Sequence, residues 1–174
     1  AGIFAAGNRT MIKPSELTPA TSEVTKKMFE AYFDKSEAAV FTGDAEVGAA
    51  FSALPFDHLL FTGGTQIGKK VMKAASENLV PVTLELGGKS PVIVDEDANL
   101  SEVAKKVMRG KTMNAGQICL APDYLMLPKG KGKEFADASS DAIGEMFKDL
   151  KYNDDYTSVI NERHYDRINE LVSD

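Results

Sequence analysis

The chain has 174 residues, of which 43% are apolar and 26% charged, and its formal net charge is −6. This is the composition of a globular protein with room for one domain or two small lobes. The negative charge argues against nucleic-acid binding and adhesion to anionic membranes, and no apolar run approaches the roughly 20 residues of a membrane helix. The single cysteine excludes an internal disulfide. With no signal-peptide pattern, it favours a reducing, cytoplasmic location.

In the first half of the chain, β-rich runs alternate with helical patterns. Thr18 is a predicted N-cap with Pro19 at the first helical position, and the helix that follows, ending near Asp34, carries Val24 and Met28 at helical spacing. We expect strands at 9–13, 38–42, 58–62 and 82–86, and two further helices at 44–54 and 65–79. This alternation predicts an α/β fold in which parallel strands form a sheet with right-handed crossovers.

After residue 89 the alternating pattern restarts. Strands are expected at 91–95 and 124–127, and helices at about 102–114, 133–150 and 161–172. The interruption at Gly87 and Gly88 therefore predicts a boundary between two domains, 1–88 and 89–174.

A glycine-rich turn at residues 63–70 (GGTQIGKK) lies between a predicted strand and a predicted helix. Backbone N–H groups and the helix dipole at such a place can hold a phosphate. The octapeptide nearly fits the P-loop pattern, but Lys70 stands where that pattern needs a magnesium-binding Ser or Thr, and the dinucleotide fingerprint Gly-x-Gly-x-x-Gly is absent. A turn that only packs the helix on the strand is the alternative.

The lone cysteine, Cys119, lies in the segment NAGQIC (114–119). A lone cysteine is often a small buried hydrophobe, but this one follows a predicted helix in an irregular segment and has no second cysteine with which to bind zinc, so no metal site is expected. The two histidines give little support to a Cys–His hydrolase. His58 begins a strand as a packing or edge residue, and His164 lies on a charged helix face.

Glu85 interrupts the apolar run VTLEL (82–86) immediately before two glycines. A carboxylate is costly to bury in such a strand unless it is paired or used, and the carboxyl ends of parallel strands face the ligand crevice of α/β proteins. Burial would raise the pKa of Glu85 toward that of a general base. The alternative is an edge position with Glu85 in solvent.

Lys13 and Glu16 follow the first predicted strand in the segment KPSE. An ammonium and a carboxylate three residues apart at a strand end could bracket a ribose. They could equally be an ordinary charge pair at a turn.

These four segments, in this order, resemble the aldehyde dehydrogenase superfamily, and within it the class 3-like branch with the bacterial coniferyl aldehyde dehydrogenases. Residues 84–90 (LELGGKS) resemble the family's glutamate signature and 114–119 its cysteine signature, and the 34 positions from Glu85 to Cys119 also fit. Residues 61–68 (FTGGTQIG) are similar to its cofactor-phosphate turn, and 7–16 (GNRTMIKPSE) to its adenosine-ribose segment.

The resemblance implies NAD(P)-dependent oxidation of an aldehyde, such as coniferyl or another aromatic aldehyde, to the carboxylic acid. Cys119 would form a thiohemiacetal and then a thioester, which water activated by Glu85 would hydrolyse. The residues implied to bind NAD or NADP are Lys13, Ser15, Glu16, Gly63, Gly64, Thr65, Gly68 and Leu86.

The resemblance also implies that this chain is an internal segment of a longer, dimeric protein. It would hold part of a Rossmann-like cofactor domain (1–88) followed by part of an α/β catalytic domain (89–174). The asparagine that helps stabilise the oxyanion in the family has no counterpart here. Two alternatives follow: a nucleotide-binding fragment without catalysis, and a CoA-acylating relative, although a glutamate placed as Glu85 is argues for hydrolysis.

Overall fold

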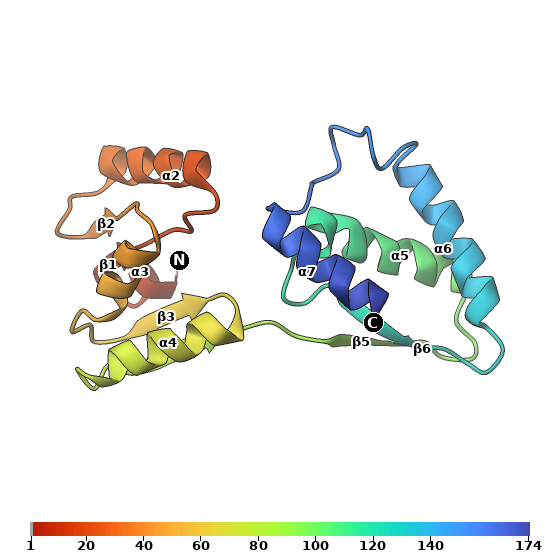
Figure 1. The fold of residues 1–174 in the computed structure, drawn as a ribbon, viewed down its shortest axis with the longest axis horizontal. Helices are drawn as coiled ribbons and strands as arrows, with labels where there is room; N and C mark the ends of the chain where they lie inside the picture. The colour runs from red at the N-terminus through yellow and green to blue at the C-terminus, as the bar shows by residue number, and fades with distance from the viewer. Residues whose placement is uncertain (1) are drawn as a thin grey trace. The chain divides into compact units, whose positions relative to one another are not determined.

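A computed structural model describes residues 2–174, and the chain forms two compact units, Ala1–Leu86 and Gly87–Asp174 (Figure 1). Both units combine helices with short parallel strands, which confirms the predicted α/β class. The division falls two residues before the predicted boundary. That the first unit serves the cofactor and the second the chemistry stays a prediction.

After α1, which the sequence analysis did not predict, the first unit follows the predicted order of strands and helices. Its elements are α1 (Gly2–Ala5), β1 (Thr10–Ile12), α2 (Pro19–Tyr32), β2 (Ala38–Val40), α3 (Ala45–Ser52), β3 (Leu59–Thr62), α4 (Thr65–Ser76) and β4 (Val82–Glu85). Pro19 stands at the start of α2 with Thr18 as N-cap, although the Thr18 side chain makes no capping hydrogen bond. Asp44 caps α3 through its side chain, which accepts from the N–H groups of Glu46 and Val47.

The strands of the first unit pair in twos. β1 pairs with β2 and β3 with β4, both in parallel, and each pair is its own two-stranded sheet. The sequence predicted that these four strands form one parallel sheet. The parallel pairing is found, but the four strands form two separate sheets. Helix α2 connects β1 to β2, and helix α4 connects β3 to β4. Helix α3, between the two pairs in the chain, packs against α4, and β3 does not pair with β1 or β2.

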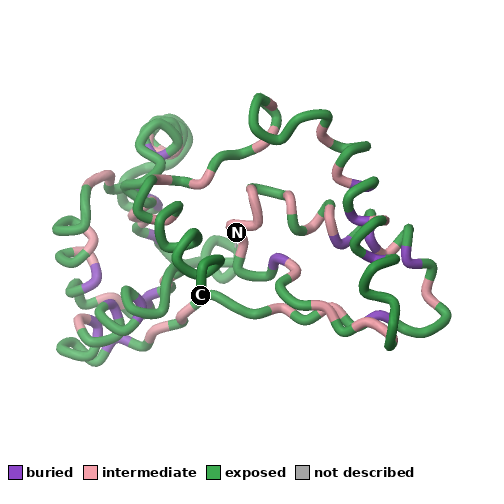
Figure 2. The backbone as a smooth tube through the Cα atoms, turned by 45° about the vertical axis from the view of Figure 1, so that its right-hand side comes forward, coloured by how far each residue is buried: buried purple, intermediate pink, exposed green. Residues whose placement is uncertain are grey.

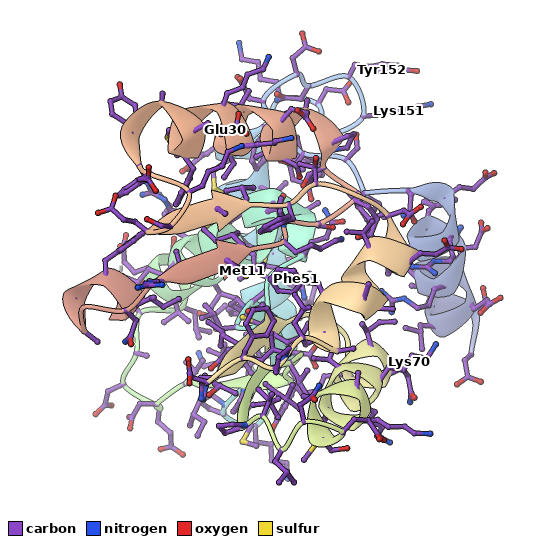
Figure 3. The ribbon with its side chains drawn as sticks, turned by 90° about the vertical axis from the view of Figure 1, so that its left-hand side faces the viewer. Met11, Glu30, Phe51, Lys70, Lys151 and Tyr152 are labelled. Carbon is purple, nitrogen blue, oxygen red and sulfur yellow. The ribbon has the colours of Figure 1, made fainter. Side chains whose placement is uncertain are left out.

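The core of the first unit lies between α4 and the β3–β4 pair. Its buried side chains are Leu59, Val71, Ala75 and Val80. Phe51 of α3, labelled in Figure 3, packs against this cluster and lies with its ring centroid 5.0 Å from that of Phe56. This packing fixes α4 on β3 and so positions the turn that joins them.

Several apolar positions of α2 that were expected to face a core are exposed. Val24, Met28 and Tyr32 are 66%, 50% and 80% exposed. Ser22 is the buried residue of α2, and its hydroxyl donates to the carbonyl of Ser15 at 3.0 Å. Helical spacing predicted the helix correctly but not what its apolar stripe covers. Buried positions form only short stretches of the backbone (Figure 2).

Two helices end three or four residues earlier than the sequence predicts. α4 stops at Ser76 rather than near residue 79, because Leu79 adopts a left-handed conformation (φ 54°) and the Val80 N–H returns to the carbonyl of Ala75. α6 stops at Met146 rather than near residue 150, because Phe147 turns to an extended conformation.

The second unit is a parallel strand pair covered by helices. Its elements are β5 (Ser90–Ile93), α5 (Leu100–Thr112), the 3-10 helix η1 (Met113–Gly116), β6 (Pro122–Met126), α6 (Gly132–Met146) and α7 (Glu162–Ser173). α5 packs against α6 and β6 around buried Leu100, Ala104, Val107 and Phe135. Among residues 2–174 no helix has the length and apolar character needed to cross a bilayer.

Candidate active site

A left-handed turn lies three residues before Cys119. Its residues Asn114, Ala115 and Gly116 have φ values of 51°, 53° and 75°. This conformation costs an L-residue other than glycine roughly 1–2 kcal/mol, and strain of this kind is concentrated at functional sites. The Cys119 side chain is exposed. In this structure Cys119 is therefore not a buried packing residue.

The Cys119 backbone packs directly on Gly88. A Cβ atom at Gly88 would lie 2.9 Å from the Cys119 carbonyl oxygen, closer than real Cβ contacts come. Nearby, Lys89 Nζ lies 3.2 Å from Asp123 Oδ1. Gly88 and Lys89, the last residues of LELGGKS before Ser90, therefore contact Cys119 and Asp123 within the second unit.

Glu85 ends β4 and is exposed. The burial expected from its apolar strand is not found in this structure. The backbone of Glu85 does meet the glycine-rich turn: the Gly63 N–H donates to the Glu85 carbonyl at 3.0 Å. The first unit therefore brings Glu85 and the start of this turn together.

The glycine-rich turn leads into the N-terminus of α4. Gly64 is the N-cap and provides no side-chain cap, and the first turn of α4 carries no acidic residue. A Cβ at Gly68 would lie 2.9 Å from Leu86 Cδ2, so glycine permits the close approach of α4 to Leu86. Uncapped N–H groups at the N-terminus of a helix whose first turn carries no acidic residue fit a pyrophosphate. Lys70, labelled in Figure 3, lies on α4.

Lys13 and Glu16 form an ion pair after β1. Lys13 Nζ lies 2.9 Å from Glu16 Oε2, with the lysine side chain 11% and the glutamate side chain 44% exposed. The Glu16 backbone N–H, and then the Lys13 ammonium, lower the pKa of the Glu16 carboxyl from its ordinary value of 4.5. Ser15 orders the same turn, because its hydroxyl accepts from the Leu17 N–H at 3.2 Å. A largely ionised carboxylate with an exposed edge fits a pair of ribose hydroxyls.

Gly48 of α3 is part of this corner, and the sequence analysis did not identify it. A Cβ there would lie 3.6 Å from Lys13 Cε. The Lys13 side chain therefore runs alongside α3. An isolated glycine in a helical pattern is the only sequence signal that could have marked this contact.

The histidines take no part in these clusters. His58 Nε2 lies 2.9 Å from Thr83 Oγ1 of the neighbouring strand, and His164 on α7 meets the side chain of Arg163. Within residues 2–174 no histidine hydrogen-bonds Cys119, and no group of three or more His, Cys, Asp or Glu residues is placed to bind a metal.

A sequence profile described as the aldehyde dehydrogenase family matches residues 1–174. The chain belongs to this family. A probable coniferyl aldehyde dehydrogenase of Caulobacter vibrioides is 58% identical to it over 174 residues, which are 100% of this chain and 36% of that relative. The predicted resemblance to the aldehyde dehydrogenases and to their coniferyl-type members is thereby confirmed.

Solved aldehyde dehydrogenases share the fold. Staphylococcus aureus AldH in a substrate-bound state matches with a TM-score of 0.90 and 43% identity, over 99% of this chain and 38% of that one. A mutant of aldehyde dehydrogenase C from Pseudomonas syringae, complexed with NAD+ and octanal, matches with a TM-score of 0.85 and 27% identity, over 97% of this chain and 36% of that one. The chain thus spans little more than a third of the aldehyde dehydrogenases that it matches.

Proposed function

We propose that this chain supplies the nucleophile, the hydrolytic carboxylate and part of the cofactor site of an NAD(P)-dependent aldehyde dehydrogenase. Family membership supports the reaction class. The observation that carries the proposal is the exposed thiol of Cys119, which follows the left-handed turn at residues 114–116 and whose carbonyl oxygen packs on Gly88. A nucleophile on a rigid, pre-shaped segment is what covalent catalysis requires.

In this proposal the Cys119 sulfur attacks the aldehyde carbonyl carbon as a thiolate, and the carbonyl oxygen becomes the alkoxide of a thiohemiacetal. NAD(P)+, when bound, would supply the hydride acceptor for that carbon, and Cys119 would then carry a thioester. Glu85 then takes a proton from water as the water oxygen attacks the thioester carbon. The C–S bond breaks, the carboxylic acid leaves, and the proton held by Glu85 passes to the departing thiolate, which restores the thiol.

The cofactor residues divide into two groups. Lys13, Ser15 and Glu16 would bind the adenosine ribose, with the exposed edge of Glu16 accepting from its hydroxyls. This arrangement favours NAD, while the nearby ammonium would tolerate the 2′-phosphate of NADP. The second group would bind the pyrophosphate and the nicotinamide half, and comprises Gly63, Gly64, Thr65, Gly68 and Leu86. The NAD+ complex of the Pseudomonas syringae relative supports this cofactor class.

Coniferyl aldehyde, or another aromatic aldehyde, is the substrate that we infer, and the identity with the Caulobacter vibrioides relative supports it. A homodimer at the protein's natural length and a cytoplasmic location stay predictions.

Aldehyde-dependent formation of NADH tests the proposal. The protein at its natural length should reduce NAD+ when coniferyl aldehyde is added, and Cys119→Ser should abolish this activity. Ser140→Ala, on the exposed surface of α6, serves as the control and should keep it. Full turnover by Cys119→Ser would refute the mechanism. A product that forms only when CoA is added would favour the acylating alternative, and NAD+ binding without turnover would favour the non-catalytic one.

A further inference from the structure

Gln117 lies between the left-handed turn and Cys119, two residues before the sulfur nucleophile. The turn is closed at its own base, where the Gln117 N–H donates to the Asn114 carbonyl at 3.0 Å and the Asn114 side-chain amide donates to the Gln117 carbonyl at 3.2 Å. Left-handed backbone persists only where surrounding contacts hold it. These local bonds involve only the turn itself, so a contact from outside is needed to fix the turn in the unit.

The Gln117 side-chain amide provides that contact. Its Nε2 donates to the Asn114 carbonyl at 3.0 Å and to the Ser158 carbonyl at 3.1 Å. Its Oε1 accepts from the Ile160 N–H at 3.0 Å. Both amide hydrogens and one oxygen lone pair are therefore used, and the opposite orientation of the amide would place like groups against each other.

The backbone that receives Gln117 is itself anchored. Tyr156 packs edge-on against Phe147 at the end of α6, with ring centroids 5.1 Å apart. On the other side Asn161 caps α7 by accepting from the His164 N–H at 3.0 Å. Residues 158–160 are thus held at both ends, which makes them a fixed support for the cysteine segment.

We propose that Gln117 is a positioning residue for the reaction of Cys119. Its amide clamps the left-handed turn to the backbone of residues 158–160 and so fixes the approach of the thiol to the aldehyde carbonyl. The clamp itself stands on the hydrogen bonds alone, and its catalytic consequence rests on the proposed function. A positioning role predicts a loss in kcat with little change in KM, because the aldehyde would still bind while fewer complexes have the reacting atoms in line.

Two variants of Gln117 separate its donor and acceptor contacts. Gln117→Met keeps the length of the side chain and removes all three bonds. Gln117→Glu keeps an acceptor for the Ile160 N–H but loses both donors. The matched control is Asn78→Leu, because Asn78 is also an amide that donates to a distant backbone carbonyl, that of Ala53 at 2.8 Å, in the first unit.

Hydrogen exchange on the chain and steady-state kinetics on the protein at its natural length provide the two readouts. Gln117→Met should raise the exchange rate of the Ile160 amide about five- to tenfold, and Gln117→Glu should raise it less. Gln117→Met should also lower kcat about tenfold or more with KM within about twofold, and Asn78→Leu should change neither readout.

Unchanged exchange at Ile160 in Gln117→Met would overturn the clamp, and faster exchange with an unchanged kcat would overturn its role in positioning. If the unmodified protein oxidises no aldehyde, the proposed function fails, while the exchange measurement still decides whether Gln117 holds the turn.

Discussion

The carbonyl oxygen of Cys119 occupies the space where a side chain at Gly88 would begin, with only 2.9 Å between that oxygen and the position of a Cβ atom. Gly88 does not need glycine for its backbone angles, because its φ is not among the positive values. Glycine is required there by the proximity of the cysteine segment. A residue from the glutamate signature therefore sets where the backbone of the proposed nucleophile can lie.

Gly88→Ala should displace the Cys119 backbone and reduce turnover. A carbonyl oxygen cannot yield as a flexible side chain does, so the segment must shift, and small displacements of a nucleophile cost about tenfold to a hundredfold in kcat. Gly144→Ala is the control, since Gly144 lies on α6 with open space around it. Steady-state oxidation of an aldehyde by the protein at its natural length measures the effect. Equal activity of the two variants would show that the contact does not matter.

Ala115→Gly should not destabilise the second unit. The left-handed conformation of Ala115 is unfavourable for alanine, whereas glycine adopts it without a steric cost. Glycine at this position should therefore leave the free energy of unfolding unchanged or raise it by up to about 1 kcal/mol. Ala104→Gly provides the contrast, because Ala104 is fully buried in α5 and glycine there loses packing and helix propensity, about 1 kcal/mol or more. Urea unfolding monitored by circular dichroism compares them. Equal destabilisation by both changes would contradict the left-handed turn.

The Glu16 carboxyl should titrate with a pKa below its ordinary value of 4.5. Its pKa is lowered, so whatever the folded state gains from this carboxylate is present above the ordinary pKa and is lost as the pH falls through the lowered value. Since the hydrogen bond from the Glu16 N–H lowers the pKa independently of Lys13, Lys13→Met should restore the ordinary pKa only in part. NMR titration of the Glu16 side-chain carbon measures both values. A complete return to 4.5 in Lys13→Met would show that the lysine alone causes the shift.

Most elements of the fold could be predicted from local patterns. Asp44 and Pro19 mark helix starts by chemistry that acts within a few residues, and the structure has both helices where these residues place them. The exposure of Val24 and Tyr32 could not be predicted, because spacing indicates an apolar face but not what packs on it. The separate strand pairs depend likewise on contacts between distant segments.

The candidate site was predicted through its motifs and not through its contacts. Cys119 and Glu85 were identified from their neighbours in the chain, yet the burial expected for Glu85 is absent. Gly48 and Gln117 were not identified from the sequence. Gly48 contacts Lys13, and Gln117 hydrogen-bonds residues 158–160, and these partners lie 35 or more positions away in the chain. Single-residue patterns carry no information on such pairs.

The most direct test of the account is to trap the thioester. Glu85→Gln at the protein's natural length, mixed with coniferyl aldehyde and NAD+, should release about one equivalent of NADH per active site and then nearly stop, since formation of the thioester does not need the carboxylate and its hydrolysis does. Mass spectrometry of the digested protein should find the acyl group on the peptide that contains Cys119. Steady turnover by Glu85→Gln, or a burst of NADH with an unmodified Cys119, would contradict the roles given to these two residues.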